Sequence, residues 1–333
     1  MAVSWTRERL LQLASGYKST CVLAAAAELD LFGVIGERSL TAVEIAQGIP
    51  CDLRGIHILL DACAAIGLLQ KQGDAYCTVP GIDGLLTDGA NGSVVAMVRH
   101  QANCLRRWAE LARVVHTGRP VERTPSIRGE AADRDSFIGA MDNISGPIAA
   151  SIIADLGDIE FKTVLDVGGA SGTWTIAFLW KYAEANAIIF DLPPVCPMAK
   201  ERIAAADLAE RVSITGGDFY NDPLPTGADL IWLSAIIHQN SREQNRRLFA
   251  ACRDALPAGG RLLIRDIVMS ESRIDPPAGA LFAINMLVAT EGGGTFTLQE
   301  LCEDLEASGF AEVSLIRRDP EWMNSVVAAR RPS

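Results

Sequence analysis

The sequence lacks several features that mark specialised classes of protein. Its 333 residues contain no internal repeat, no low-complexity segment and no CxxC pair. The most apolar run near the start, residues 21–35, is interrupted by Glu28 and Asp30 and is too short for a membrane span. The N-terminus also lacks the basic-then-apolar layout of a secretion signal. We therefore expect a cytoplasmic protein with no membrane partner.

The sequence also has few histidines and no net positive charge. The chain has four histidines, none of them spaced with the eight scattered cysteines as in a zinc site, so we expect reduced thiols and no metal ion. The formal net charge of −11 repels phosphates. Although residues 99–113 are locally basic, we expect no nucleic acid partner.

What the sequence has is enough apolar material for two folded domains. Hydrophobic residues make up 49% of the chain and charged residues 21%, and 333 residues exceed what one core usually organises. We assign residues 1–100 to a helical N-terminal domain, residues 101–156 to connecting helices and residues 157–333 to a C-terminal domain.

The first hundred residues follow the periodicity of helices. Thr41 and Glu44 are spaced as a capping box, and apolar residues recur at helical spacing over residues 56–67. Two short extended runs over residues 68–79 then predict a β-hairpin. Helix, helix and hairpin in this order indicate a winged-helix-like domain. We class this domain as all-α because the hairpin supplies its predicted strands and helices make up the rest.

After Phe161 the pattern changes to short apolar runs separated by helices. Such runs predict buried parallel strands, over residues 163–167, 187–190, 212–215, 229–233 and 261–268. Two final strands, 312–316 and 325–329, leave no room for a helix between them and should pair antiparallel. The predicted fold class is α/β, with a doubly wound, Rossmann-like sheet of seven strands whose last strand is antiparallel.

A glycine-rich turn follows the first predicted strand directly. Residues 164–172 read VLDVGGASG and lead into a helix predicted over residues 173–183. The turn does not spell GxGxxG and no Walker lysine follows, so it fits neither a dinucleotide loop nor a phosphate-cradling loop well. A tight strand-to-helix turn without a ligand is the alternative interpretation.

Aspartates end the next two predicted strands. Asp191 ends the second strand, where a carboxylate accepts hydrogen bonds from the ribose hydroxyls of a nucleoside. Asp218 ends the third, where it could face an adenine while Phe219 packs on the ring. These acidic strand ends suit a cationic sulfonium nucleoside, which has no pyrophosphate, better than NAD. As the alternative, each is only a turn or cap aspartate.

A histidine and another aspartate follow on the next two strands. His238 comes after the fourth strand and is our candidate for the base that deprotonates an acceptor hydroxyl. Alternatively, His238 only caps the helix that begins near Ser241. Asp266, at the end of the fifth strand, could orient His238 as the carboxylate of a triad does. Its alternative partner is Arg265 or a surface cation, because alternate strand residues point to opposite faces.

Several of these motifs occur together in one known family. LDVGGASG, FDLP at residues 190–193, GDF at residues 217–219 and the histidine after the fourth strand resemble the small-molecule O-methyltransferases of the plant caffeate and bacterial polyketide type, over nearly the whole chain. The resemblance implies S-adenosylmethionine as cofactor, a small-molecule acceptor, and a homodimer formed through a winged-helix-like dimerisation domain. It also implies a catalytic domain of seven strands with the last one antiparallel.

The resemblance also implies the roles of individual residues. The methyl donor should contact Gly168, Asp191, Asp218, Phe219 and Ser234, while Met141 and Met286 should line the acceptor pocket. We extend the candidate donor site to neighbouring positions, namely Asp166, Gly169, Gly172, Leu192 and Gly217. We extend the candidate acceptor pocket to Asn143, Trp232, Asn285 and Thr295, and we expect residues 101–156 to contribute to it.

The sequence departs from the family pattern at several positions. Ala170 replaces the third of three consecutive glycines, and Gln239-Asn240 replaces the Asp-Trp that usually follows the histidine. Asp266 matches one of two glutamates that flank the histidine, but the second aligns with Thr295, which cannot be an anion. We therefore expect intact donor binding and a weaker set of groups around the base. An acidic phenol, which ionises easily, would need less help from the base, and methylation driven mostly by proximity stays open as well.

Two other functions remain open from the sequence. A member of the same fold could methylate nitrogen, or bind the donor without transferring methyl. The second alternative function is that of a winged-helix DNA-binding regulator with a ligand-sensing α/β domain. Arg54 and His57 are the only obvious DNA contacts in the sequence. The alanine-rich stretch 23–31 could form a dimer interface or ordinary intrachain core.

Overall fold

The computed structural model describes residues 4–90 and 92–333, which form two compact units. The first unit comprises Met1–Arg106 and Arg123–Asn143, and the second comprises Arg107–Glu122 and Ile144–Ser333. Two helices, α7 (Val95–Trp108) and α9 (Gly129–Asp155), run from one unit into the other. The domain limits expected from the sequence at residues 100 and 156 stay a prediction.

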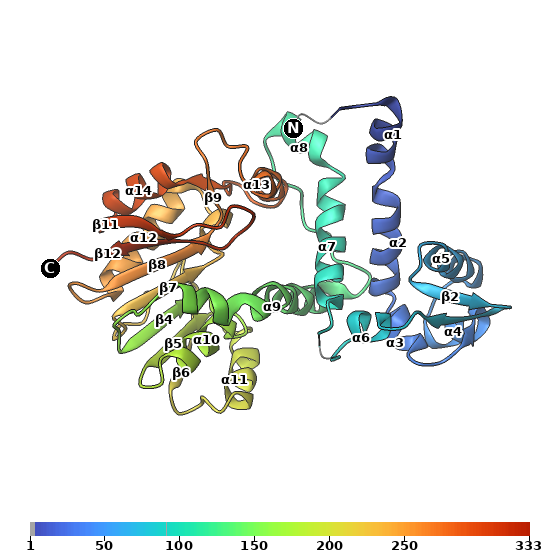
Figure 1. Ribbon diagram of the computed structural model, residues 1–333, viewed down its shortest axis with the longest axis horizontal. Coiled ribbons are helices and arrows are strands. Elements are labelled where there is room, and N and C mark those ends of the chain that lie inside the picture. The colour runs from blue at the N-terminus through green and yellow to red at the C-terminus, as the bar shows by residue number, and fades with distance from the viewer. Residues whose placement is uncertain (1–3, 91) are drawn as a thin grey trace. The chain divides into compact units, whose positions relative to one another are not determined.

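The first unit is built mainly from short helices (Figure 1). In chain order they are α1 (Arg7–Ser15), α2 (Tyr17–Glu28), α3 (Leu31–Ile35), α4 (Ala42–Gly48), α5 (Leu53–Ala65) and α6 (Ile82–Leu86). The predicted capping box is confirmed, because the Thr41 side chain accepts from the Glu44 backbone N–H and the Glu44 carboxylate accepts from that of Thr41. Apolar side chains such as Phe32 and Leu60 form the core of this unit.

The predicted hairpin is also confirmed. Strands β2 (Leu69–Gln72) and β3 (Ala75–Thr78) pair antiparallel, and β1 (Leu40–Thr41) adds to β3 as a third strand. The Tyr76 side chain points into the core, and its hydroxyl donates to Asp61 at 2.7 Å. The hairpin is thereby tied to α5.

Part of the alanine-rich stretch 23–31 belongs to the core of its own chain. Ala26, Ala27 and Leu31 are fully buried within the first unit, and the buried Arg99 donates to the Ala27 carbonyl at 2.9 Å. These three side chains are therefore intrachain core, while Leu23, Ala25 and Leu29 of the same stretch stay partly exposed. A contribution of this stretch to a dimer interface stays a prediction. By contrast, α1 buries none of its residues.

The second unit contains the predicted seven-stranded sheet. Its strand order is β11-β12-β8-β7-β4-β5-β6, with β12 antiparallel to both β8 and β11 and the other pairs parallel. The strands are β4 (Thr163–Val167), β5 (Asn186–Asp191), β6 (Val212–Gly216), β7 (Leu230–Ser234), β8 (Arg261–Asp266), β11 (Ala311–Arg317) and β12 (Ser325–Arg330). Each overlaps the strand expected from the sequence.

Helices cover both faces of this sheet (Figure 1). One face packs on α12 (Arg242–Ala255) and α14 (Leu298–Ala307), and the other on α9, α10 (Thr173–Lys181) and α11 (Cys196–Ala205). Two separate apolar cores result, one on each side of the same strands, which is the doubly wound arrangement. Capping boxes at Ser241 and Thr297 begin α12 and α14.

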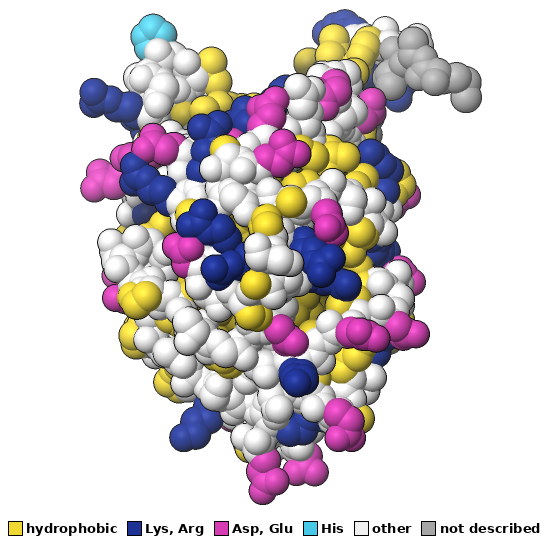
Figure 2. All heavy atoms as spheres, turned by 90° about the vertical axis from the view of Figure 1, so that its left-hand side faces the viewer, with side chains coloured by type: hydrophobic (Ala, Val, Ile, Leu, Met, Phe, Trp, Pro, Cys, Tyr) yellow, Lys and Arg dark blue, Asp and Glu magenta, His cyan; other side chains and the backbone are white. Residues whose placement is uncertain are grey.

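The remaining elements of the second unit lie outside the main sheet. They are α8 (Leu111–Thr117), the single helical turn η1 (Ile237–Gln239), α13 (Pro277–Ala289) and the parallel pair of β9 (Val268–Met269) with β10 (Phe296–Thr297). Helix α9 is long and apolar enough to cross a membrane, but core helices of folded domains pass the same test. On the face of the molecule shown in Figure 2, Lys and Arg side chains are interspersed with Asp and Glu.

Candidate active site

The glycine-rich turn after β4 is built from left-handed backbone. Gly168, Ala170 and Gly172 all have positive φ, at +69°, +47° and +79°. At Gly168 a Cβ would lie 2.7 Å from the Ile236 Cδ1 atom, so no larger residue fits without a shift. Ala170, which stands where the family has a glycine, therefore adopts a conformation that costs an L-residue about 1–2 kcal/mol.

Asp191 holds this turn against the end of β5. Its carboxylate accepts hydrogen bonds from the Ala170 and Leu192 backbone N–H groups, both at 2.7 Å. Burial raises the pKa of Asp191, while the two backbone donors oppose the rise. The side chain is only partly buried, so lone pairs of the two oxygens remain for a ligand. The Leu192 side chain beside it is exposed.

The loop after β6 lies next to the glycine turn. Gly217 donates its N–H to the Asp191 carbonyl at 2.9 Å, and its close packing on the Phe190 ring leaves no room for a side chain. The Asp218 carboxylate accepts from the backbone N–H of Tyr220 and the side chain of Asn221, which is the behaviour of a turn aspartate. The Phe219 ring comes within 3.8 Å of where a Gly168 Cβ would stand. The predicted donor residues 168, 191, 217, 218 and 219 are therefore close together.

Asp166 lies beneath the glycine turn. Its carboxyl is 1% exposed, accepts from the Thr175 hydroxyl at 2.7 Å and packs under Gly169. Burial raises the pKa of Asp166 to about 7, with the nearby Asp191 charge as a smaller cause. Its side chain therefore faces the core below the turn, and the expected direct contact of Asp166 with the donor stays a prediction.

Trp232 is likewise not at the edge of the sheet. It is the register partner of Asp166 on β7, so both side chains are on the sheet face that packs on α10. Its ring is fully buried, with ring centroids 5.3 Å from both Trp174 and Phe178. Its ring is part of the core, and the expectation that Trp232 lines the acceptor pocket stays a prediction.

Ser234 ends β7 above a buried arginine. The Arg265 side chain, 1% exposed, donates to the Ser234 hydroxyl at 3.1 Å and to the Asn324 side chain at 2.6 Å. Its guanidinium stacks over the Trp174 ring at 4.5 Å, and burial lowers the pKa of Arg265 to about 10. Arg265 therefore joins the end of β7 to the loop before β12.

His238 and Asp266 form a hydrogen-bonded pair. Turn η1 follows β7 and places the His238 Nδ1 atom 3.0 Å from both carboxylate oxygens of Asp266, which is 2% exposed at the end of β8. Carboxylate oxygens only accept, so Nδ1 carries the proton and Nε2 remains free to take another. The alternatives for both residues are wrong: Asp266 pairs with the histidine, and the Ser241 side chain caps α12 by itself.

A buried amide network holds the His238 segment, and the sequence did not indicate it. The Tyr220 hydroxyl donates to the Asn240 amide oxygen, and the Asn240 NH₂ donates to Asn245 at 3.0 Å. Asn245 in turn donates to the Ile237 carbonyl at 3.0 Å. The loop after β6 is thereby linked to η1 through two asparagines, one of which stands in the Asp-Trp position of the family.

The candidate acceptor residues divide between the two units. The Phe282 ring on α13 packs edge-on against the His238 ring, with centroids 4.8 Å apart. Asn285 and Met286 follow on the same helix, and Gly294, next to Thr295, donates its N–H to the His238 carbonyl at 2.8 Å. Met141 and Asn143 belong to the first unit, where the Asn143 NH₂ donates to the Ser93 carbonyl at 2.7 Å.

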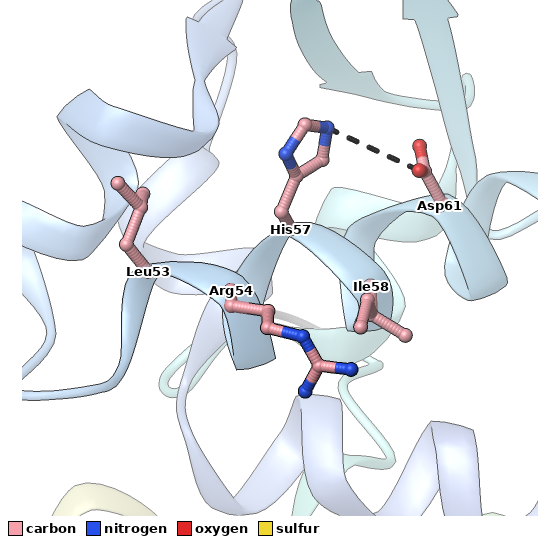
Figure 3. Close-up of a pocket in the computed structure, with 5 residues that line it drawn as sticks. All are labelled: Leu53, Arg54, His57, Ile58 and Asp61. Carbon is pink, nitrogen blue, oxygen red and sulfur yellow. Dashed lines mark ion pairs between the residues drawn. The ribbon is translucent and has the colours of Figure 1, made fainter.

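A shallow pocket on the first unit includes the two residues considered for DNA contact. Arg54 and His57 lie on α5 beside the exposed apolar side chains of Leu53 and Ile58 (Figure 3). The His57 Nε2 atom faces the Asp61 carboxylate at 3.9 Å. A pocket lined by an acidic residue and two apolar side chains is better suited to contact another protein surface than the phosphates of DNA.

Comparisons with known proteins agree with this geometry. The O-methyltransferase domain family matches residues 108–311, and the O-methyltransferase dimerisation domain family matches residues 11–79. The chain is 34% identical to 3-hydroxy-5-methyl-1-naphthoate 3-O-methyltransferase of Streptomyces sahachiroi, over 96% of the chain and 94% of that protein.

Two solved structures cover nearly the whole chain. Human N-acetylserotonin methyltransferase in complex with SAM has a TM-score of 0.78 at 26% identity, covering 100% of both chains. The N,N-8-amino-8-demethyl-D-riboflavin dimethyltransferase of Streptomyces davawensis has a TM-score of 0.79 at 27% identity, covering 98% of this chain and 100% of that one. Relatives of this chain therefore include a protein named for methylation of oxygen and one named for dimethylation of nitrogen.

Proposed function

The chain belongs to the S-adenosylmethionine-dependent O-methyltransferase family, and from this we propose that it methylates a phenolic hydroxyl of a small aromatic or polyketide-like metabolite, with His238 as general base. The observation that carries the proposal is the His238–Asp266 pair, which leaves Nε2 free at the end of the sheet where the donor residues gather. Histidine is the residue type that most readily accepts a proton from a hydroxyl near neutral pH.

The residues around the glycine turn fit the methyl donor. The partly buried Asp191 carboxylate would accept from the two ribose hydroxyls, and the Phe219 ring would pack on the adenine. No Walker lysine follows the turn directly, which suits a ligand without phosphate. Bound S-adenosylmethionine supplies an electrophilic methyl group on a positively charged sulfur.

The protein's own part in the reaction is proton transfer and orientation. His238 Nε2 would accept the proton of the acceptor hydroxyl as its oxygen takes the methyl group, and S-adenosylhomocysteine would leave with the electron pair of the broken carbon–sulfur bond. Asp266 accepts from Nδ1, which fixes the plane of the ring and offsets the positive charge that the imidazole gains. Phe282 packs against the ring and limits its contact with water.

The position of Thr295 favours a phenol over an aliphatic alcohol. The second carboxylate of the family is missing there, so a single carboxylate supports the histidine. A phenol ionises near pH 10, several units below an alcohol, and therefore needs less help from the base. The naphthoate relative, whose name describes methylation of an aromatic hydroxyl, supports the same acceptor class.

Nitrogen methylation is the second candidate function. A neutral amine attacks without prior loss of a proton, so it would tolerate Thr295, and the riboflavin-type relative dimethylates an amine. The hydrogen-bonded His238–Asp266 pair favours oxygen, because an amine acceptor has less use for such a base.

The proposal extends to assembly and location. We propose a homodimer formed through the first unit, a division of the chain into residues 1–100, 101–156 and 157–333, and a cytoplasmic site of action. The match to a dimerisation domain over residues 11–79 supports the first point.

Methyl-labelled donor tests the reaction directly. The protein is incubated with it and with three acceptors that share one ring system and carry a phenol, an aromatic amine or a benzylic alcohol. We expect label on the phenol, with the other two at least about tenfold slower because the base acts mainly on the phenol. Faster labelling of the amine would move the function to nitrogen, and label on none of the three would exclude this acceptor class.

A further inference from the structure

One hydrogen bond joins two side chains that are far apart in the sequence. The Trp108 indole Nε1–H, at the end of α7, donates to the Asn285 amide oxygen on α13 at 2.9 Å. Both residues belong to the second unit, and both side chains are partly buried. An indole N–H can only donate, so it selects which end of the amide faces it. The Asn285 oxygen is therefore directed toward Trp108 and its NH₂ group away.

The NH₂ group of Asn285 is left as an unused donor. None of the residues in 4–90 and 92–333 accepts a hydrogen bond from it. Such a group, held in one orientation beside a reaction site, can select a ligand by its hydrogen-bonding pattern.

Helix α13 brings this donor close to the base. Phe282 and Asn285 are three residues apart and therefore lie on one face of the helix, about 4.5 Å apart along its axis. The Phe282 ring packs on the His238 imidazole. The amide donor therefore lies on the same side of α13 as the ring that packs on the base.

We propose that Trp108 is a positioning residue that orients Asn285 to bind a carbonyl or carboxylate oxygen of the acceptor. The acceptor is then an aromatic compound in which such an oxygen is carried on the ring system that bears the hydroxyl. Binding at Asn285 places the hydroxyl at His238 Nε2. If the amide turned over, its oxygen would face the acceptor oxygen and repel it. This inference rests on the proposed function.

The test compares a hydroxynaphthoate with the naphthol that lacks its carboxylate. Acceptor affinity is measured by titration calorimetry on protein saturated with S-adenosylhomocysteine, so the readout does not depend on turnover. We expect wild-type protein to bind the hydroxynaphthoate more tightly by about tenfold, the value of one hydrogen bond to a charged group. Trp108→Phe, which keeps an aromatic ring but loses the N–H, should abolish most of this preference.

Asn285→Ala and the double variant complete a thermodynamic cycle. Asn285→Ala should abolish the preference, and Trp108→Phe should then change it no further, because the two residues act through one donor. A merely structural role of Trp108 would weaken both acceptors equally and leave the preference intact, which would overturn the proposal. Equal affinity of wild-type protein for both acceptors would overturn it too.

The two proposals fail in different ways. Loss of label transfer with the binding preference intact would count against the proposed reaction and not against the role of Trp108. Label transfer to the acceptor without any preference in binding would count against the role of Trp108 and not against the proposed reaction. If Trp108→Phe does not fold, Asn285→Ala alone decides, because a preference that survives this change excludes Asn285 as the recognising group.

Discussion

At the residue scale, the base is a histidine with one carboxylate partner. Asp266 is almost fully buried, and both of its carboxylate oxygens accept from the His238 Nδ1–H. One of these oxygens also accepts from the Ile267 backbone N–H. Its negative charge is therefore fixed beside the imidazole. A ring held on one nitrogen by a carboxylate presents the other nitrogen in a constant direction, which is what a general base requires.

Replacement of the base should slow the reaction without affecting the donor. We expect His238→Ala to lower kcat by roughly two to four powers of ten, because the hydroxyl must then attack with its proton in place. Asp266→Asn should cause a smaller loss, since the ring remains but its charge is no longer offset. Steady-state kinetics with labelled donor measure both changes, and calorimetry with S-adenosylhomocysteine should give unchanged affinity. Full activity of His238→Ala would place the base elsewhere.

At the element scale, the strands of the sheet could be predicted from local sequence. Apolar runs that end at Gly, Asp or Ser indicate buried parallel strands, and all seven were found within a few residues of their predicted bounds. The side chains after them, such as Asp191 and His238, could be placed at one edge because the carboxyl ends of parallel strands meet there.

Side-chain orientation could not be predicted in the same way. Asp166 and Trp232 were assigned to the ligand side, but the packing of α10 determines which face of β4 and β7 is core. Contacts between distant segments were also beyond local patterns. Tyr220 meets Asn240, and Trp108 meets Asn285, only because the loops and α13 fold over the sheet edge.

The buried end of β4 should make stability depend on pH. The pKa of Asp166 is raised from 3.8 to about 7 in the folded protein, so between these values the folded chain keeps a proton that the unfolded chain releases. The free energy of unfolding should therefore fall as pH rises through this window. The Asp166→Asn variant cannot ionise at this position and serves as the reference. Relative to it, the free energy of unfolding of wild-type protein should fall by roughly 1 kcal/mol per pH unit between pH 5 and pH 7, and by little more above pH 7.

Urea denaturation of both proteins from pH 5 to pH 8 measures this difference. Asp158→Asn, at an exposed position, controls for the loss of one negative charge and should show no such trend. Asn at position 166 can still accept from Thr175, so the comparison isolates the ionisation. A constant difference between wild-type protein and Asp166→Asn across this range would show that the carboxyl ionises as freely as it does in the unfolded chain.

At the scale of the whole molecule, the first unit has apolar side chains that the described residues, 4–90 and 92–333, leave exposed. Leu10 and Leu13 on α1 are 53% and 67% exposed, and Leu53 and Ile58 on α5 are about as exposed. Exposed apolar side chains that share a helix face indicate a contact surface. A second copy of the chain is the partner that the dimerisation-domain match over residues 11–79 supports.

Charge placed on α1 should therefore separate the dimer. Leu10 and Leu13 are three residues apart and share one helix face, so Leu10→Arg with Leu13→Arg would put four buried charges into a symmetric interface. We expect the dimer dissociation constant to rise by at least about a hundredfold, because the apolar burial is lost and the like charges repel. Sedimentation velocity over a range of concentrations measures this. Trp180→Arg, at an exposed apolar position on α10 outside residues 11–79, should leave the dimer intact. A wild-type chain that sediments as a monomer, or a double variant as dimeric as wild-type protein, would rule out α1 as the interface.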